Sequence, residues 1–328
     1  MTAERSRLRV AVVGVGYLGR HHARILADLD GADLVGVVDR NAERAAHVAA
    51  AHGTVALPDV AALLGAVDAA VVAVPTEDHV AVASPLVEHG VSVLVEKPMA
   101  RDLGEADALI EAAETRGVVL AVGHTERYNP AVAAALPLVR DPGFAEVHRL
   151  GTFPERSLDI DVVFDLMIHD IDVLLAAIPG EVVGVEAVGV PVLTDRVDIA
   201  NARLRFASGC IANLTASRIS RDRVRKARFF QRDAYLSIDY ASQEVERWTL
   251  SRGDGPRPAI EGGKLDVARD EPLRVELADF LAAVRDRRAP RVTGADGRRA
   301  LALAQRVSDA IGEGRRPEPS PAPRVTGR

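Results

Sequence analysis

The chain has 328 residues, enough for two domains with substantial cores, and its 48% hydrophobic and 27% charged residues are ordinary for a soluble globular protein. Its net charge of −6 provides no overall field that would attract nucleic acid. No apolar stretch is long enough for a membrane span, and Met1 to Arg9 contains no signal-peptide core, so we expect a cytoplasmic protein. A single cysteine, Cys210, excludes an internal disulfide and any cysteine-based metal site.

The first motif predicts a dinucleotide-binding unit. Leu8 to Val13 is a β-branched apolar run typical of a buried strand, and it leads into a G-x-G-x-x-G motif and a helix over His21–Leu29. Gly14 allows a tight turn, Gly16 lets a pyrophosphate approach the backbone, and Gly19 lets the helix pack close to the strand. The N–H groups at the start of that helix would face the phosphates. The other cofactor contacts expected within the motif are Tyr17 and Leu18.

An acidic residue at the end of the second predicted strand favours NAD over NADP. The strand covers Asp33–Val38, and Asp39 follows it. A carboxylate at this position accepts hydrogen bonds from both ribose hydroxyls and repels a 2′-phosphate. Arg40 comes next and could hold a 2′-phosphate if Asp39 turned away, which leaves NADP open. The strand, the helix and the acid together favour a cofactor site over a glycine-rich turn that binds nothing.

The rest of the first 125 residues alternates apolar strands with helices, which predicts a doubly wound parallel sheet. We expect these elements over 42–52, 61–64, 69–74, 80–89, 91–95, 103–116 and 118–122. Ligands of such sheets bind beyond the carboxyl ends of the strands. The loops that follow the strands should therefore line one crevice, and the further cofactor contacts expected there are Pro75, Thr76, His79, Glu96 and Lys97.

Beyond residue 125 the pattern changes to consecutive strands with short turns, which predicts an α/β domain with a large, open, mostly antiparallel sheet. Strands are expected over 182–190, 199–206, 211–217, 224–230, 234–238 and 244–250, and helices over 131–139, 163–178, 272–287 and 296–312. The polar segment 251–270 is expected to be a mobile loop.

We expect three parts. Residues 1–125 form an NAD-binding Rossmann domain. Residues 126–314 form a domain for substrate binding and oligomerisation, whose last helix is free to pack back on the first domain. Residues 315–328, which contain four prolines, form a disordered tail.

Lys97 is the first candidate for a role in catalysis. It ends a predicted strand, and Pro98 biases it towards an extended conformation. An ammonium group beside a nicotinamide can orient or polarise a substrate oxygen, or relay a proton. An ordinary surface lysine is the alternative, and the position at the predicted crevice favours the functional interpretation.

Asp165, His169 and Asp172 form a second candidate group on one predicted helix. Their i, i+4, i+7 spacing places them on one face. Carboxylates one turn on either side should orient the imidazole and raise its basicity, so that it can accept the proton of an alcohol while hydride leaves the same carbon. A solvated polar stripe and a divalent metal site are the alternatives, although no third or fourth metal ligand is evident.

Two further polar segments could contact a substrate. The junction 123–130 offers Glu126, Arg127, Tyr128 and Asn129, which could equally be hinge or capping residues. The run 218–228 contains six basic residues and one acid. It could anchor a pyrophosphate or nucleotide, or form a solvated hairpin edge whose charges discourage edge pairing. Nucleic-acid binding is disfavoured because the run is short and lacks interleaved aromatic residues.

The motif at Gly14, the Glu96-Lys97-Pro98 turn and the Asp165-x-x-x-His169 pair together resemble the Gfo/Idh/MocA family of sugar dehydrogenases. The resemblance covers nearly the whole chain apart from the tail. It implies a Rossmann domain followed by an α/β domain whose open sheet joins subunits, and hence a homodimer or homotetramer. It also implies that Lys97 and His169 are the catalytic pair, that Asp165 supports them, and that all three contact the substrate.

A narrower resemblance comes from the stretches 123–131, 148–172 and 198–220. They look like the subgroup that oxidises the 3-hydroxyl of UDP-N-acetylglucosamine with NAD, from which an aminotransferase makes a 3-amino sugar used in lipid A. Under this resemblance Arg127, Arg149 and Arg156 are compatible with the diphosphate of the substrate. The alternatives are a dehydrogenase of a free sugar or inositol, and a non-catalytic NAD-sensing module.

Overall fold

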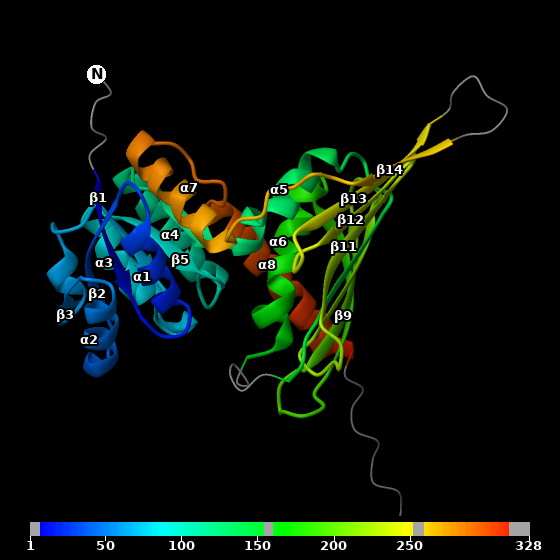
Figure 1. The fold of residues 1–328 in the computed structure, drawn as a ribbon. Helices are drawn as coiled ribbons and strands as arrows, with labels where there is room; N and C mark the ends of the chain where they lie inside the picture. The colour runs from blue at the N-terminus through cyan, green and yellow to red at the C-terminus, as the bar shows by residue number, and fades with distance from the viewer. Residues whose placement is uncertain (1–6, 154–159, 252–258, 315–328) are drawn as a thin grey trace, which may run out of the picture.

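The computed structural model describes residues 7–153, 160–251 and 259–314, which form two sheets with helices between them (Figure 1). One sheet has six strands and the other has eight. The first is parallel and the second is mostly antiparallel, so the expected α/β fold class is confirmed. None of the described helices is long and apolar enough to cross a membrane.

The first sheet forms from short apolar runs that are buried on both faces. Its strands are β1 (Leu8–Val13), β2 (Ala32–Val38), β3 (Ala56–Leu57), β4 (Ala69–Val72), β5 (Ser92–Glu96) and β6 (Leu120–Gly123). They are ordered β3-β2-β1-β4-β5-β6, and neighbouring strands run parallel. The strand order reverses between β1 and β4, which places a ligand crevice at the carboxyl ends of these two strands.

The helices that join these strands lie close to the predicted bounds. They are α1 (Gly19–Asp28), α2 (Ala42–Ala51), α3 (His79–Glu88) and α4 (Leu103–Arg116), with short 3-10 turns η1 (Val60–Leu63) and η2 (Thr76–Asp78). Asn41 and Asp102 cap the first turns of α2 and α4 with their side-chain oxygens. Gly117 ends α4 in the left-handed conformation that favours glycine.

The second sheet is built mostly from consecutive strands joined by turns. Its strands are β7 (Phe144–Leu150), β8 (Val182–Val190), β9 (Ile199–Phe206), β10 (Ile211–Ser217), β11 (Val224–Gln231), β12 (Ala234–Asp239), β13 (Glu244–Ser251) and β14 (Ala259–Lys264). They are ordered β14-β13-β12-β11-β7-β10-β9-β8. Neighbouring strands are antiparallel except for β7 and β10, which run parallel.

Two strands of this sheet differ from the sequence expectations. β7 lies in a segment for which we predicted no element. β14 lies inside the segment 251–270, so the prediction of a mobile loop is wrong for residues 259–264, which pair with β13. The residues 252–258 of that predicted loop, and the predicted tail at 315–328, lie outside the described residues.

Helices cover one face of the second sheet. After β6 come η3 (Thr125–Tyr128), α5 (Pro130–Ala135) and η4 (Leu136–Leu138), and after β7 come η5 (Val163–Met167) and α6 (Ile168–Ala177). Because η5 is a turn of π-helix, the predicted helix over 163–178 is not a uniform α-helix. The face of the sheet turned away from the first domain carries no helix of the described chain (Figure 1).

The chain returns to the first domain near its end. α7 (Pro272–Asp286) packs on α1 (Figure 1). Its Leu277 and Phe280 are buried in one apolar cluster with Ile25. α8 (Gly294–Gly314) then joins the two domains, because Leu301 belongs to a core of the first and Val307 to the core of the second. α7 thus completes the first domain, and α8 bridges both. A functional boundary at residue 125 remains our proposal.

Candidate active site

The glycine motif forms a tight turn between β1 and α1. Gly14 has a φ of +85°, and a Cβ there would lie 2.7 Å from the backbone of Ala73. A Cβ on Gly19 would overlap the carbonyl group of Gly14, whereas a Cβ on Gly16 would meet nothing within 4 Å. α1 begins without a side-chain cap and without an acidic residue in its first turn. The turn therefore fits a pyrophosphate, with open space at Gly16 and uncapped helix N–H groups.

Asp39 lies beside this turn. Its carboxylate accepts hydrogen bonds from the N–H groups of Val15 and Asn41, at 2.9 and 2.8 Å, and two from the guanidinium of Arg44, at 3.0 and 2.7 Å. Partial burial opposes ionisation, but these hydrogen bonds outweigh it and lower the pKa of Asp39. A carboxylate has about four acceptor positions. Ribose hydroxyls would therefore bind Asp39 by displacing Arg44.

The other predicted cofactor residues of this sheet lie in the loops that follow β1, β2 and β4, on either side of the point where the strand order reverses. Four of them are exposed or half-buried there: Tyr17, Leu18, Pro75 and Thr76. Arg40 is exposed and pairs with Asp78 at 2.8 Å. A 2′-phosphate would have to break this ion pair, which agrees with the preference for NAD that we predicted from Asp39.

Glu96 and His79 turn towards the protein interior. The buried carboxylate of Glu96 accepts hydrogen bonds from His22 of α1, at 2.8 Å, and from the backbone N–H of Lys97, at 3.2 Å. The ring nitrogens of His79 each lie 2.9 Å from a backbone carbonyl, one in the turn after β4 and one directly after Lys97. The two side chains hold in place the turn that carries Lys97, and their contact with the cofactor stays a prediction.

Lys97 reaches across the domain junction. Its Nζ donates a hydrogen bond to the backbone carbonyl of Asp165 at 2.7 Å and lies 3.5 Å from the carboxylate of the same residue. Burial lowers the pKa of this ammonium group, and the carboxylates of Asp165 and Glu96 oppose that change. Lys97 is thus fixed against the turn that precedes His169.

His169 lies in the first turn of α6, half-buried, with Lys97 and Arg149 as charged neighbours. Burial lowers the pKa of its imidazole well below the ordinary value, and the charges of Lys97 and Arg149 lower it further. The prediction that flanking carboxylates raise its basicity is therefore wrong. The neutral imidazole is nevertheless the protonation state that a general base requires.

The two carboxylates expected beside His169 point elsewhere. Asp165 faces Lys97, and the Oδ1 of Asp172 accepts a hydrogen bond from Arg127 at 3.3 Å. Asp172 is only 2% exposed, so this segment is not a solvated polar stripe. Within the described residues, no group of three or more His, Cys, Asp or Glu side chains is placed to hold a metal ion.

The polar residues of the domain junction hold the protein's own structure together. Tyr128 donates to a carboxylate of α7 at 3.0 Å, and Asn129 caps α5; both are 2% exposed. Glu126 accepts from Arg149 at 2.9 Å, and Arg127 donates to a carboxylate of α6 at 3.3 Å. The structure therefore favours the hinge and capping interpretation of these residues over substrate contact.

Most cations of the run 218–228 have partners in the same domain. Three of them pair with carboxylates there: Arg218, Lys226 and Arg228. The guanidinium of Arg225 makes no hydrogen bond or ion pair within the described residues, and its charge contributes to lowering the pKa of His169. Arg225 is the cation of this run whose charge acts on His169, and it is therefore the candidate in this run for binding an anion beside the site. Arg156, the other predicted substrate contact, lies outside the described residues.

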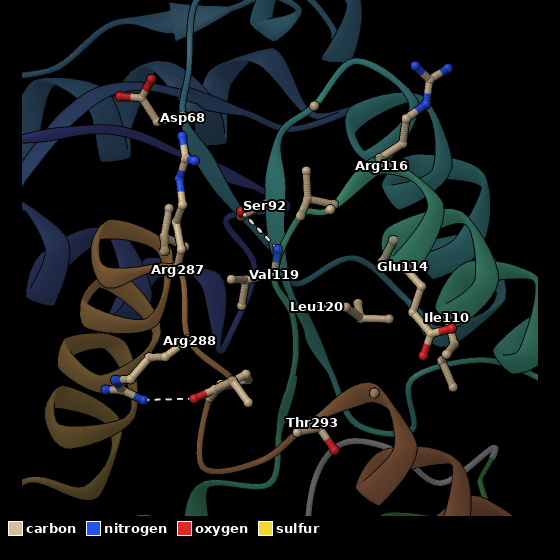
Figure 2. A pocket seen from close by; sticks show the side chains of 18 of the residues that line it. Asp68, Ser92, Ile110, Glu114, Arg116, Val119, Leu120, Arg287, Arg288 and Thr293 are labelled. Carbon is tan, nitrogen blue, oxygen red and sulfur yellow. Dashed lines mark hydrogen bonds between the residues drawn. The ribbon is translucent and has the colours of Figure 1, made fainter.

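A separate cavity lies at the opposite end of the first sheet. Figure 2 shows it, with Ser92, Leu120, Arg287 and Thr293 among its lining residues. Ser92 and Leu120 are the first residues of β5 and β6, whereas Lys97 follows the carboxyl end of β5. This cavity is therefore distinct from the site that contains Lys97 and His169.

Fold and site together define an oxidoreductase with a nucleotide-binding domain. Residues 8–124 match the family described as "Oxidoreductase family, NAD-binding Rossmann fold", and residues 145–234 match the GFO/IDH/MocA C-terminal domain. The chain belongs to the Gfo/Idh/MocA family of oxidoreductases, and its cofactor is NAD. The resemblance inferred from the motifs is confirmed.

Known relatives match the chain over nearly its whole length. UDP-N-acetylglucosamine 3-dehydrogenase of Acidithiobacillus ferrooxidans is 43% identical over 312 residues, which cover 93% of this chain and 97% of that enzyme. A solved structure of that enzyme has a TM-score of 0.88 at 42% identity and covers 94% of this chain and 98% of its own. Levoglucosan dehydrogenase in complex with NADH and levoglucosan has a TM-score of 0.84 over 94% of this chain and 98% of its own, but at 19% identity it shows the fold alone.

Two side chains that shape the site were missed from the sequence. Arg44 lies in the first turn of the helix after Asp39, and this spacing could have indicated their ion pair. His22 follows the glycine motif on the buried face of α1. Arg149, which was named from the sequence as compatible with the substrate's diphosphate, is buried and pairs with Asp170 and Glu126. It lies in β7, a strand that was not predicted, so its position beside His169 could not be inferred from the sequence.

Proposed function

We propose that this chain oxidises the 3-hydroxyl of UDP-N-acetylglucosamine to a ketone with NAD. One observation carries the proposal: Lys97 Nζ lies 2.7 Å from the carbonyl of Asp165, one turn before His169. An ammonium from one domain and an imidazole from the other therefore lie close together. The 43% identical relative, a UDP-N-acetylglucosamine 3-dehydrogenase, supports the choice of substrate.

In the proposed reaction the substrate hydroxyl lies between Lys97 and His169. When bound, NAD supplies the hydride acceptor for the carbon that carries this hydroxyl. His169 takes the hydroxyl proton, because its low pKa keeps the imidazole neutral. Lys97 donates a hydrogen bond to the same oxygen and stabilises the negative charge that develops on it. Asp165 holds the ammonium in place through its backbone carbonyl.

The proposal extends to assembly and to the fate of the product. We propose that an aminotransferase converts the 3-keto product into a 3-amino sugar for lipid A, and that the enzyme works in the cytoplasm. We propose a homodimer or homotetramer formed through the second sheet, whose Val188 and Trp248 are 60% and 40% exposed.

A screen of nucleotide sugars and free sugars with NAD tests the proposal. UDP-N-acetylglucosamine should yield NADH and a product that is two hydrogens lighter, with a carbonyl at carbon 3 by mass spectrometry. A preference for a free sugar or inositol would point to the other kind of dehydrogenase. An absence of NADH with every substrate would point to an NAD-sensing module.

A further inference from the structure

A cluster of buried polar side chains lies behind His169, where the two domains meet. Several of its atoms are buried and lack a hydrogen-bond partner within the described residues: Nδ1 of His22, both ring nitrogens of His124, Nε of Arg127, Nδ1 of His169, Oδ2 of Asp172 and Oε1 of Glu276. They come from α1, α6, α7 and the segment that begins η3. Such atoms are rare in folded proteins, so their concentration in one place requires an explanation.

The groups in this cluster are neighbours. The rings of His124 and His169 lie edge to face with their centroids 6.3 Å apart. Asp172 is close enough to His124 to oppose the lowering of its pKa, and close enough to Glu276 to raise the pKa of that residue. Glu276 accepts a hydrogen bond from Thr125 at 3.1 Å with its other oxygen.

Burial favours the neutral form of each titratable group here. It lowers the pKa of His124 and His169 and raises the pKa of Asp172 and Glu276. The charged groups that face the two histidines from neighbouring elements are Glu96, Lys97, Arg127, Arg149, Asp172 and Arg225. A neutral imidazole and a protonated carboxyl group can each both donate and accept a hydrogen bond, and bridging water can connect groups that are too far apart for a direct hydrogen bond.

We propose that His124 and Asp172 form a water-linked proton relay on the Nδ1 side of His169, away from the substrate. This inference rests on the function proposed above, in which His169 is the base. His169 accepts the substrate's hydroxyl proton on Nε2, and its Nδ1 proton passes through water to an unprotonated ring nitrogen of His124. The other ring nitrogen of His124 passes its proton to the unpartnered Oδ2 of Asp172, which becomes protonated. This step requires Asp172 to start as the carboxylate, a form that the charge of Arg127, which donates to its Oδ1, favours against the effect of burial. Hydride leaves the substrate carbon separately with its electron pair, so the relay carries one proton and no electrons.

In this relay His124 is a positioning residue, because it acts on the substrate only through His169. The substitution His124→Asn keeps a donor and an acceptor but removes the group that can carry a proton. We expect kcat to fall on the order of tenfold, with the Kd for NAD unchanged. Because proton transfer becomes slower, the solvent isotope effect on kcat should rise, and the acid limb of the pH profile should move.

The matched control is His47→Asn, which changes an exposed histidine on α2. Its isotope effect and pH profile should equal those of the unchanged enzyme. Thermal melting and calorimetric titration with NAD report whether each variant is folded. A folded His124→Asn variant with an unchanged isotope effect and pH profile overturns the relay.

If His124→Asn does not fold, Asp172→Asn tests the other end of the relay. It should raise the solvent isotope effect in the same way, and an unchanged isotope effect in that variant overturns the proposal. His169→Ala separates this inference from the proposed function. Full turnover in His169→Ala overturns the assignment of the base itself, whereas lost turnover with a normal His124→Asn profile overturns only the relay.

Discussion

The Nζ of Lys97 lies 2.7 Å from the backbone carbonyl of Asp165, so a lysine at the end of β5 is held by the turn that precedes α6. A backbone carbonyl does not titrate, so this hydrogen bond does not depend on the charge of its acceptor. The carboxylate lies farther away, at 3.5 Å. The hydrogen bond to the backbone, rather than the ion pair, sets the place of the ammonium group.

Removing the ammonium group of Lys97 should abolish most of the turnover. The substitution Lys97→Met keeps the length of the side chain but leaves no donor for the substrate oxygen. We expect kcat to fall at least about a hundredfold, while NAD still binds. Steady-state kinetics and calorimetric titration with NAD measure the two effects. Full activity in this variant would show that Lys97 has no part in the reaction.

The pH profile of kcat/KM should reflect the lowered pKa values of His169 and Lys97. His169 must be neutral to accept a proton, and its pKa lies well below 6.5 in the folded enzyme. Activity should therefore persist as the pH falls past 6.5 and decline only at the lower pKa of the folded state. Lys97 must be charged, and burial lowers its pKa below 10.5, so the alkaline limb should also lie below 10.5. An acid limb at or above pH 6.5 would contradict the assignment.

The choice of cofactor should depend on Asp39. The substitution Asp39→Ala removes the acceptor for the ribose hydroxyls. It also frees Arg44, whose guanidinium pairs with Asp39 in the unchanged protein. We expect the affinity for NAD to fall about tenfold, an effect on the order of 1.4 kcal/mol, and the affinity for NADP to rise relative to it. Arg44→Ala is the control, because it leaves the carboxylate in place and should keep the preference for NAD. Calorimetric titration with both cofactors measures the ratio of the Kd for NADP to the Kd for NAD. An unchanged ratio in Asp39→Ala would count against the role of Asp39.

The buried pair of Glu96 and His22 should matter for stability. Glu96→Ala leaves the buried ring of His22 without its partner and loosens the turn that carries Lys97. We expect a loss of about 3 kcal/mol in the free energy of unfolding, together with a lower kcat. Glu244→Ala is the comparison: it removes one side of the exposed pair with Lys264 and should change the stability little. Urea denaturation measures the free energy of unfolding of both variants. Equal losses of this free energy would contradict a structural role of the buried pair.

Arg225 should contribute to the binding of a substrate that carries a diphosphate. Its guanidinium is close to His169 and has no partner within the described residues, so it is available for an anion. We expect Arg225→Ala to raise the KM for UDP-N-acetylglucosamine about tenfold and to weaken inhibition by UDP similarly, with kcat little changed. Arg221→Ala, an exposed change in the same basic run, should leave both values unchanged. Equal KM values in the two variants would exclude this role of Arg225.

The elements that could be predicted from the sequence are those whose signals are local. The bounds of α4 follow from its cap at Asp102 and from Gly117. β9 and β10 are marked by apolar residues at alternating positions, which the structure buries, and by the turn between the two strands. β14 gave no such signal, because Gly262 and Gly263 interrupt its pattern and it depends on pairing with β13. Local periodicity cannot show a strand that exists only through its neighbour.

The sequence was enough to predict which residues form the candidate site, but not which way their side chains point or which partners they contact. The identity of Lys97 and His169 follows from motifs. The pKa of His169 depends on burial and on the charges of Lys97, which follows β5, and Arg149 of β7. These residues are distant from His169 in the sequence or lie in a strand that was not predicted. Tyr128 was expected to face a substrate, but its partner lies in α7, 151 residues further along the chain. Only the tertiary arrangement shows that such a side chain is already used.

The position of α7 has a consequence for the synthesis of this protein. Leu277 and Phe280 fill the apolar surface that α1 presents, so the nucleotide-binding half is incomplete until the ribosome has released that helix. A nascent chain would expose the inner side of α1 through most of translation, which makes it a target for chaperones. We expect a fragment that ends at residue 271 to aggregate, and co-expression of residues 272–314 as a separate peptide to restore its solubility.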